Sequence, residues 1–182
     1  MFEGEYLNGK KNGKCKEYHY GYLIFEGEYL NGQRHGKCKE YNDKGKLKFD
    51  GEYLNGKIWN GKYNEYYYDN DKLIFEGEYL NGQKNGKGKE YYKGKLRFEG
   101  EYLNGERKRK GKEYDYNGNL IFEGEYLNGK KHGEGKDYYG NGKLKFEGEY
   151  LNGKRNGKGK EYDYNGNLIF EGKYLNGNKI IN

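Results

Sequence analysis

The stretch FEGEYLNG, at residues 2–9, decides the fold because the chain repeats it from end to end. The same eight letters return five times, and the near-copies FDGEYLNG and FEGKYLNG stand at 49–56 and 170–177. Self-similarity at a fixed period predicts a repeat architecture. We therefore expect a single repeat array over residues 1–182, with seven full repeats and a partial C-terminal one that start near 2, 25, 49, 75, 98, 122, 146 and 170.

One repeat, which begins at Phe146, reads as a β-hairpin. In its first strand the side chains alternate, with Phe146, Gly148 and Tyr150 on one face and Glu147, Glu149 and Leu151 on the other. Alternation with period two is typical of a half-buried strand. Asn-Gly at 152–153 predicts a turn that continues through 154–156, a second strand follows over 157–164, and Asn-Gly at 165–166 predicts the next turn.

Stacked hairpins of this kind predict an all-β fold. We expect an elongated single sheet of about 15 short antiparallel strands, in which each hairpin pairs with the next and stability comes from nearest neighbours. Rings supply the apolar burial, because aromatic residues make up 18% of the chain and all hydrophobic residues only 32%. A glycine such as Gly148 is expected where a side chain would compete with neighbouring rings.

Two repeats depart from the pattern. The third carries the single tryptophan, Trp59, and what reads as one additional residue before Gly61, which predicts a longer or bulged turn. The fifth places Arg109 where the best-preserved copy has Gly157, which predicts a distorted entry into the second strand.

The residues at 122–135 resemble the MORN repeat, whose pattern is aromatic-x-Gly-x-aromatic-x-x-Gly-x-x-His-Gly-x-Gly. The matching positions are Phe122, Gly124, Tyr126, Gly129, His132, Gly133 and Gly135. Most other copies have Asn in place of His, and the segment 89–100 looks closer to the variant form of the repeat that is widespread in bacteria. The resemblance implies a MORN-type solenoid of stacked hairpins. It also implies a scaffold, a dimerisation arm or an appendage to an enzyme, and in some arrays a link to phosphoinositide-rich membranes.

Composition argues against several kinds of active site. The sequence contains no Ser or Thr that could act as a nucleophile. Cys15 and Cys38 occupy equivalent glycine positions in successive hairpins, about two strand spacings apart, which is too far for a disulfide. His19, His35 and His132 are scattered, so we expect no metal site, no other cofactor and no catalytic residue.

The densest group of basic residues lies in the fifth repeat. Arg107, Lys108, Arg109, Lys110 and Lys112 could contact the phosphates of an anionic surface, although a solvated turn is the simpler interpretation. Over the whole chain, 35 basic and 29 acidic residues are interleaved in nearly every repeat, so we expect no nucleic-acid partner. Recurring pairs such as Glu147 and Glu149 are expected to form cross-strand Glu–Lys pairs on a solvated face.

The function that these observations favour is a non-enzymatic scaffold that binds a protein partner or forms a homo-oligomer, since open strand edges favour further pairing. The alternative is peripheral binding to an anionic membrane through the Lys/Arg-rich turns. A sugar- or choline-binding array would need more Trp, so no small-molecule substrate is expected. Without a visible signal peptide or an apolar run of about 20 residues, we expect a cytoplasmic protein, with a membrane-peripheral location under the alternative.

Overall fold

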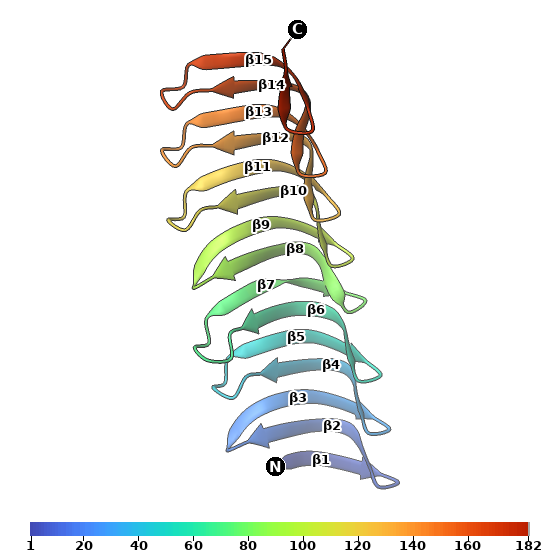
Figure 1. Cartoon of the computed structure of the whole chain (residues 1–182). Helices are drawn as coiled ribbons and strands as arrows, with labels where there is room; N and C mark the ends of the chain where they lie inside the picture. The colour runs from blue at the N-terminus through green and yellow to red at the C-terminus, as the bar shows by residue number, and fades with distance from the viewer. Residues whose placement is uncertain (182) are drawn as a thin grey trace. The chain divides into compact units, whose positions relative to one another are not determined.

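The structure, a computed structural model, describes residues 1–181, and within them it is all β (Figure 1). The strands follow one another in the sheet in chain order, and every described pair is antiparallel. They are β1 (Phe2–Leu7), β2 (Lys10–His19), β3 (Tyr22–Leu30), β4 (Gln33–Tyr41), β5 (Leu47–Leu54), β6 (Lys57–Tyr66), β7 (Leu73–Leu80), β8 (Gln83–Tyr92), β9 (Lys95–Leu103), β10 (Glu106–Tyr114), β11 (Leu120–Leu127), β12 (Lys130–Tyr138), β13 (Leu144–Leu151), β14 (Lys154–Tyr162), β15 (Leu168–Leu175) and β16 (Asn178–Ile180).

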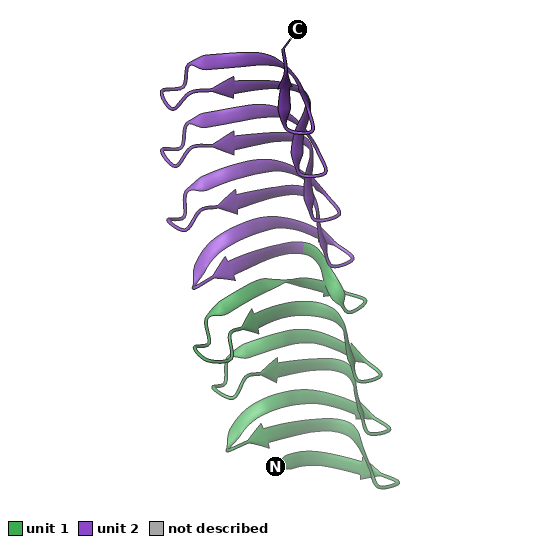
Figure 2. Ribbon diagram, in the orientation of Figure 1, with its two compact units in different colours: residues 1–86 green, residues 87–182 purple. Residues whose placement is uncertain are grey.

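The predicted stack of antiparallel hairpins is confirmed, with sixteen strands among residues 1–181 instead of about 15. The contacts of the chain group into two compact units, residues 1–86 and 87–182, which are described separately (Figure 2). No helix within the described residues could cross a lipid bilayer.

Two-residue Asn-Gly turns join the strands of each hairpin. At Asn152 and Gly153 the φ angles are 51° and 87°, and the same signs recur at the equivalent turns. Positive φ at both residues defines the type I′ turn, whose twist matches that of the flanking strands. The predicted turn at 152–153 is therefore confirmed, but its continuation through 154–156 is wrong, because β14 begins directly at Lys154.

A β-bulge makes this early start possible. Tyr150 pairs with Arg155 and Gly148 with Gly159, so that Glu149 faces three residues of β14, at 156–158. Gly157, at the centre of this bulge, has a φ of 82°, and the backbone N–H of Lys158 donates a 3.0 Å hydrogen bond to the Glu149 carboxylate. The strand thus continues past residues whose sequence resembles a loop.

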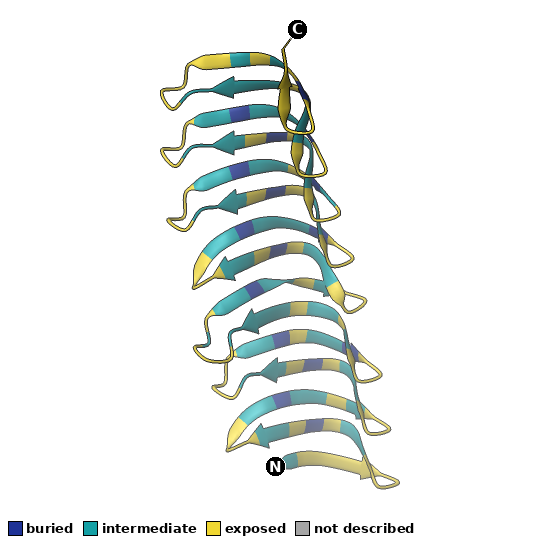
Figure 3. Cartoon of the chain, in the orientation of Figure 1, coloured by how far each residue is buried: buried dark blue, intermediate teal, exposed yellow. Residues whose placement is uncertain are grey.

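The core of each unit is a row of phenylalanine and tyrosine rings on one face of the sheet, which we call the aromatic face. Figure 3 shows the buried positions repeating from strand to strand. Phe25, Phe49, Phe122 and Phe146 are completely buried. Each phenylalanine also meets the tyrosine four residues later edge to face, for example Phe146 and Tyr150 with ring centroids 5.5 Å apart. Edge-to-face pairs of this kind add to the burial of ring area.

The two irregular repeats differ from what the sequence predicts. The third hairpin keeps its two-residue turn at Asn55-Gly56, and its bulge is one residue shorter, since Gly51 pairs with Gly61. The sequence predicts a longer or bulged turn there: the longer turn is wrong, whereas a bulge is present beside the turn, between Glu52 and Tyr53. In the fifth hairpin Arg109 adopts a φ of 59° in place of glycine, and the pairing keeps the usual register. The departure therefore lies in the backbone of Arg109 and not in the entry of the strand.

Candidate functional site

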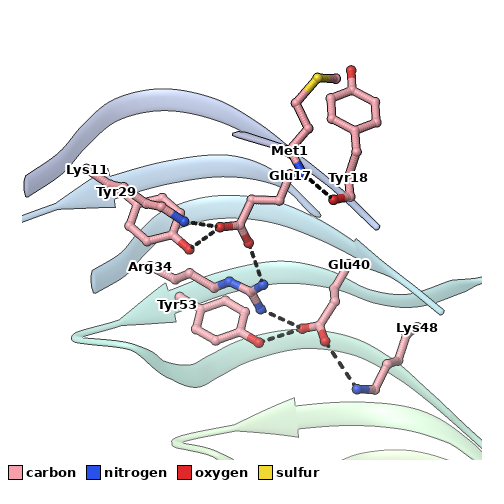
Figure 4. A network of polar contacts seen from close by, with 9 residues as sticks. All are labelled: Met1, Lys11, Glu17, Tyr18, Tyr29, Arg34, Glu40, Lys48 and Tyr53. Carbon is pink, nitrogen blue, oxygen red and sulfur yellow. Dashed lines mark hydrogen bonds and ion pairs between the residues drawn. The ribbon is translucent and has the colours of Figure 1, made fainter. Parts of the chain in front are cut away.

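The aromatic face carries a ladder of charges above its rings, and in the first unit this ladder runs across four hairpin strands (Figure 4). Arg34 lies between two carboxylates, donating to Glu17 at 2.9 Å and to Glu40 at 3.3 Å. Its guanidinium carbon stands 4.0 Å from the centre of the Phe25 ring. Lys11 also pairs with Glu17, and Lys48 donates to Glu40 at 3.1 Å.

Tyrosine hydroxyls complete the hydrogen bonding of these carboxylates. Tyr29 donates to Glu17 at 3.0 Å and Tyr53 donates to Glu40 at 2.6 Å. Burial by itself would raise the pKa of Glu17, but the hydrogen bonds from Lys11, Arg34 and Tyr29 outweigh it and lower that pKa. Glu17 therefore stays ionised near neutral pH and is poorly suited to donate a proton as a general acid.

The second unit repeats this arrangement. Its cations each connect two hairpins: Lys131 lies 3.4 Å from both Glu113 and Asp137, and Arg155 lies 3.1 Å from both Asp137 and Glu161. Lys131 and Arg155 also stand 3.7 Å and 4.0 Å from the ring centres of Phe122 and Phe146. Charges that are paired with each other and stacked on rings stabilise the repeat and leave little capacity for an external ligand.

The ladder stops at the third hairpin. Ile58 stands at the position of the cation, and Tyr63 pairs with Phe49 where the other hairpins place a carboxylate. Tyr63 packs on aromatic rings instead, with its centroid 6.2 Å from that of Phe49 and 5.1 Å from that of Tyr79. The second strand of this hairpin thus has apolar contacts in place of the cation and carboxylate, while Lys48 on its first strand still pairs with Glu40.

The basic cluster predicted in the fifth repeat is divided between different surroundings. Arg107 belongs to the ladder, because it stacks 3.9 Å above Phe98 and pairs with Glu90 and Glu113. Arg109 and Lys110 are exposed, and the side chain of Arg109, 78% exposed, lies 3.3 Å from Glu101. Lys112 lies 4.0 Å from Glu123, and Lys108 is half-buried.

The remaining candidates from the sequence are structural in their surroundings. Cys15 and Cys38 are free, buried thiols, and burial raises the pKa of Cys38 to about 12, which opposes formation of a nucleophilic thiolate. His35 pairs with Glu28 at a bulge, and His19 is exposed beside Tyr20. Among residues 1–181, no group of three or more side chains is arranged to hold a metal ion.

The face opposite the rings, which we call the leucine face, has a different character. Glu147 accepts a hydrogen bond from Tyr162 at 2.8 Å, and Lys160 lies 3.5 Å from Glu171, so Glu–Lys pairing does occur there but is shared with tyrosine. A leucine stands at the turn end of each first strand, and it is exposed in every hairpin except that of β11, where Leu127 is half-buried. The exposed leucines form a row in each unit, Leu7, Leu30, Leu54 and Leu80 in the first and Leu103, Leu151 and Leu175 in the second.

The alternation of the sequence places Leu151 on this face, but it does not by itself mark the leucine as a functional residue. The signal was present, because a leucine recurs in every repeat on the opposite parity to the phenylalanine and tyrosine. An apolar side chain that recurs on the solvated face is not needed for the core. It is therefore a candidate for contact with another molecule.

The MORN repeat family matches residues 2–20, 25–46, 75–96, 98–120 and 146–168, and the MORN repeat variant matches residues 131–152. The segment 89–100, which looks closer to the variant, instead lies within two matches to the standard repeat. A comparison with curated proteins gives no match. MORN repeats are associated with scaffolds that bind proteins or membranes and are not an enzyme family. The matched segments cover more than half of the sequence, so this chain belongs to the MORN repeat family.

Proposed function

We propose that this chain is a non-enzymatic, cytoplasmic scaffold that binds protein partners through the leucine rows of its hairpins. The observation that carries the proposal is the contrast between the two faces. On the aromatic face, cations, carboxylates and tyrosine hydroxyls bind one another over buried rings. On the other face, the leucines of both rows are between 39% and 56% exposed. Apolar side chains that recur on an exposed surface favour contact with another protein.

The test is a comparison of captured partners. The intact chain and a variant with Leu7, Leu30, Leu54 and Leu80 changed to Glu would each be expressed in the native cell and their bound proteins identified. Because these leucines are exposed, the variant is expected to keep its circular-dichroism spectrum. We expect it to lose partners that the intact chain retains. An identical set of partners for both proteins would exclude the leucine row of the first unit as the binding surface.

Self-association is the homotypic form of this proposal. A leucine row of one copy would then cover a leucine row of another. Size-exclusion chromatography with light scattering, over a hundredfold range of concentration, measures this directly. A mass that rises with concentration in the intact chain but not in the Leu→Glu variant supports it, and a monomer at every concentration excludes it.

A second candidate is peripheral binding to an anionic membrane. The exposure of Arg109 and Lys110 favours it, because these cations extend from the leucine face and Lys112 lies nearby. Flotation with vesicles that contain anionic lipid tests it, with Arg109, Lys110 and Lys112 changed together to Gln. Loss of flotation supports the role. Unchanged flotation removes these three residues from consideration. Arg107 is left intact because its change would disturb the core.

A further inference from the structure

The spacing of the leucines in the first unit can be compared with the repeat distances of the regular backbone conformations that a partner could adopt. Successive leucines lie on every second strand, at Leu7 (β1), Leu30 (β3), Leu54 (β5) and Leu80 (β7). Neighbouring strands are about 4.8 Å apart, so the leucines recur about every 9.6 Å and the four span about 29 Å. All four are exposed, and Figure 3 shows exposed positions at the turn ends of these strands.

Among regular backbones, polyproline II fits this interval best. It has three residues per turn and rises about 3.1 Å per residue, so every third side chain returns to the same face after about 9.3 Å. A heptad along an α-helix advances about 10.5 Å and drifts by about 3 Å over the row. A β-strand returns to one face after about 6.6–6.8 Å, so three such steps reach only every second leucine and the leucines between have no matching side chain.

Trp59 supplies a second observation at the same end of the sheet. Leu54 pairs with Lys57, and Asn60 pairs with Leu80, so the backbone of Trp59 lies between these two leucines in the row. Its carbonyl accepts a 3.0 Å hydrogen bond from the backbone N–H of Gly82, and its side chain is 38% exposed. Proline-rich segments dock against exposed aromatic side chains, so the position of Trp59 beside the leucines favours such a partner.

The charges in the row complement an acidic partner. Lys10 and Lys57 stand opposite Leu7 and Leu54, both are exposed, and no ion pair is described for either within residues 1–181. The row therefore presents leucines separated by unpaired cations and by the amides of Gln33 and Gln83.

We propose that the leucine row of the first unit, with Trp59 between Leu54 and Leu80, binds a polyproline II segment of a partner protein that carries an apolar residue at every third position and carboxylates between them. The inference rests on the proposed scaffold function and specifies its partner. The occupant is not a second copy of this chain, because the sequence contains no proline.

The experiment uses the fluorescence of Trp59, which is the single tryptophan of the chain. The intact protein is titrated with a synthetic peptide of four Leu-Pro-Glu repeats, excited where tyrosine does not absorb. We expect a saturable shift of the emission to shorter wavelength. Three other ligands are titrated separately for comparison. They are a peptide of the same composition in scrambled order, a helical peptide with leucine at every seventh position, and vesicles of anionic lipid. An equal or stronger response to any of these three overturns the proposal.

Variants locate the binding. Leu30→Glu and Leu54→Glu each remove one side chain of the row and are expected to weaken the peptide about tenfold. Leu151→Glu is the matched control, at the same repeat position of the second unit, and should leave the affinity unchanged. Unchanged affinity in Leu54→Glu, with a normal circular-dichroism spectrum, overturns the assignment. If the peptide fails while captured partners still depend on the leucines, the scaffold function stands and the polyproline shape is wrong.

Discussion

Each repeat phenylalanine owes its burial to the glycine two residues after it. A Cβ atom at Gly124 would lie 2.7 Å from the tip of the Phe122 ring, 2.7 Å from Cα of Gly135 and 2.7 Å from the carbonyl oxygen of Glu134. The ring therefore occupies the space that a side chain would take, and the neighbouring strand leaves no room for adjustment. Steric exclusion between ring and backbone explains why the Phe-x-Gly spacing is kept through the array.

Substituting this glycine is expected to be costly. Gly124→Ala should lower the free energy of unfolding by about 3 kcal/mol, because two of the three close contacts are backbone atoms that cannot turn aside. Gly140→Ala is the control, since nothing lies within 4 Å of its Cβ position and its φ is not positive. Urea unfolding of both variants tests the argument. Equal losses in the two would contradict it.

The stacked cations make a second prediction at the scale of single residues. Arg34→Met leaves Glu17 and Glu40, both largely buried, without the cation that they share. We expect a loss of about 2 kcal/mol, less than for a fully buried pair because Arg34 is partly exposed. Arg34→Lys should retain much of the stability, since Lys11 and Lys131 occupy the equivalent position.

Arg109, which is exposed, serves as the control for the loss of stability expected in Arg34→Met. Arg109→Met removes only an ion pair with Glu101 on the solvated face and should change stability by less than about 0.5 kcal/mol. Thermal or urea unfolding measures all three variants. A loss in Arg109→Met as large as that in Arg34→Met would show that burial over the phenylalanine ring does not strengthen the ladder.

At the scale of the strand and hairpin, the sequence predicts the faces well and the strand limits poorly. Alternation places Phe146 and Tyr150 on one face and Leu151 on the other, and the first two are buried while the third is exposed. The start of β14 could not be read in this way, because a bulge admits Asn and Gly into the strand and hides its beginning. Period two describes a regular ladder, and a bulge breaks that period locally.

The candidate site shows the same limit. Five neighbouring cations in the sequence looked like one patch. The bulge at Arg109 breaks the alternation along β10, so Arg107 lies over Phe98 whereas Arg109, two residues later, extends into solvent. In the third hairpin, Asn-Gly at 60–61 looks like the Asn-Gly of a bulge, which ends at Gly157 in the best-preserved copy. The structure instead pairs Gly61 with Gly51, as Gly159 pairs with Gly148. The local sequence alone does not show which glycine pairs with the glycine of the neighbouring strand.

The bulge of the fifth hairpin leads to a prediction of increased stability. Arg109 holds a φ of 59°, a left-handed conformation that costs a residue with a Cβ about 1–2 kcal/mol. Arg109→Gly should raise the free energy of unfolding by about 0.5–1 kcal/mol, after allowance for the greater freedom of glycine in the unfolded chain. Gly157→Ala, at the equivalent bulge with a φ of 82°, should lower it. Opposite signs in urea unfolding are expected, and a loss of stability in Arg109→Gly would contradict the strain argument.

Across the whole molecule, tyrosine hydroxyls donate many of the side-chain hydrogen bonds that serine, threonine and asparagine provide in other proteins. On the leucine face, hydroxyls donate to carboxylates of the preceding hairpin strand at 2.9 Å in Tyr41–Glu26 and at 2.6 Å in both Tyr114–Glu99 and Tyr138–Glu123. On the aromatic face, Tyr53 and Tyr150 donate to Glu40 and Asp137. Where folding raises the pKa of a tyrosine that makes such a hydrogen bond, the stability of the chain is linked to its proton.

This linkage predicts loss of stability at alkaline pH. Burial, together with the hydrogen bond to a glutamate, raises the pKa of Tyr41, Tyr114 and Tyr138 to about 12, from 10.0 for the free side chain. Below pH 10 both the folded and the unfolded chains keep these protons, so the full stability is present. Between pH 10 and 12 the unfolded chain releases them while the folded chain retains them, and the free energy of unfolding falls as pH rises.

Urea unfolding at a series of alkaline pH values, followed by phenolate absorbance, measures this dependence. In Tyr41→Phe the loss of the hydrogen bond to Glu26 lowers the stability at neutral pH, but one titrating group is removed, so the fall of stability with pH becomes shallower. The variant is therefore less stable than the intact chain at neutral pH but loses less stability at alkaline pH. The difference between their free energies of unfolding should narrow as the pH rises from 10 to 12. A difference that stays constant with pH would mean that the proton of Tyr41 is not held more tightly by the fold.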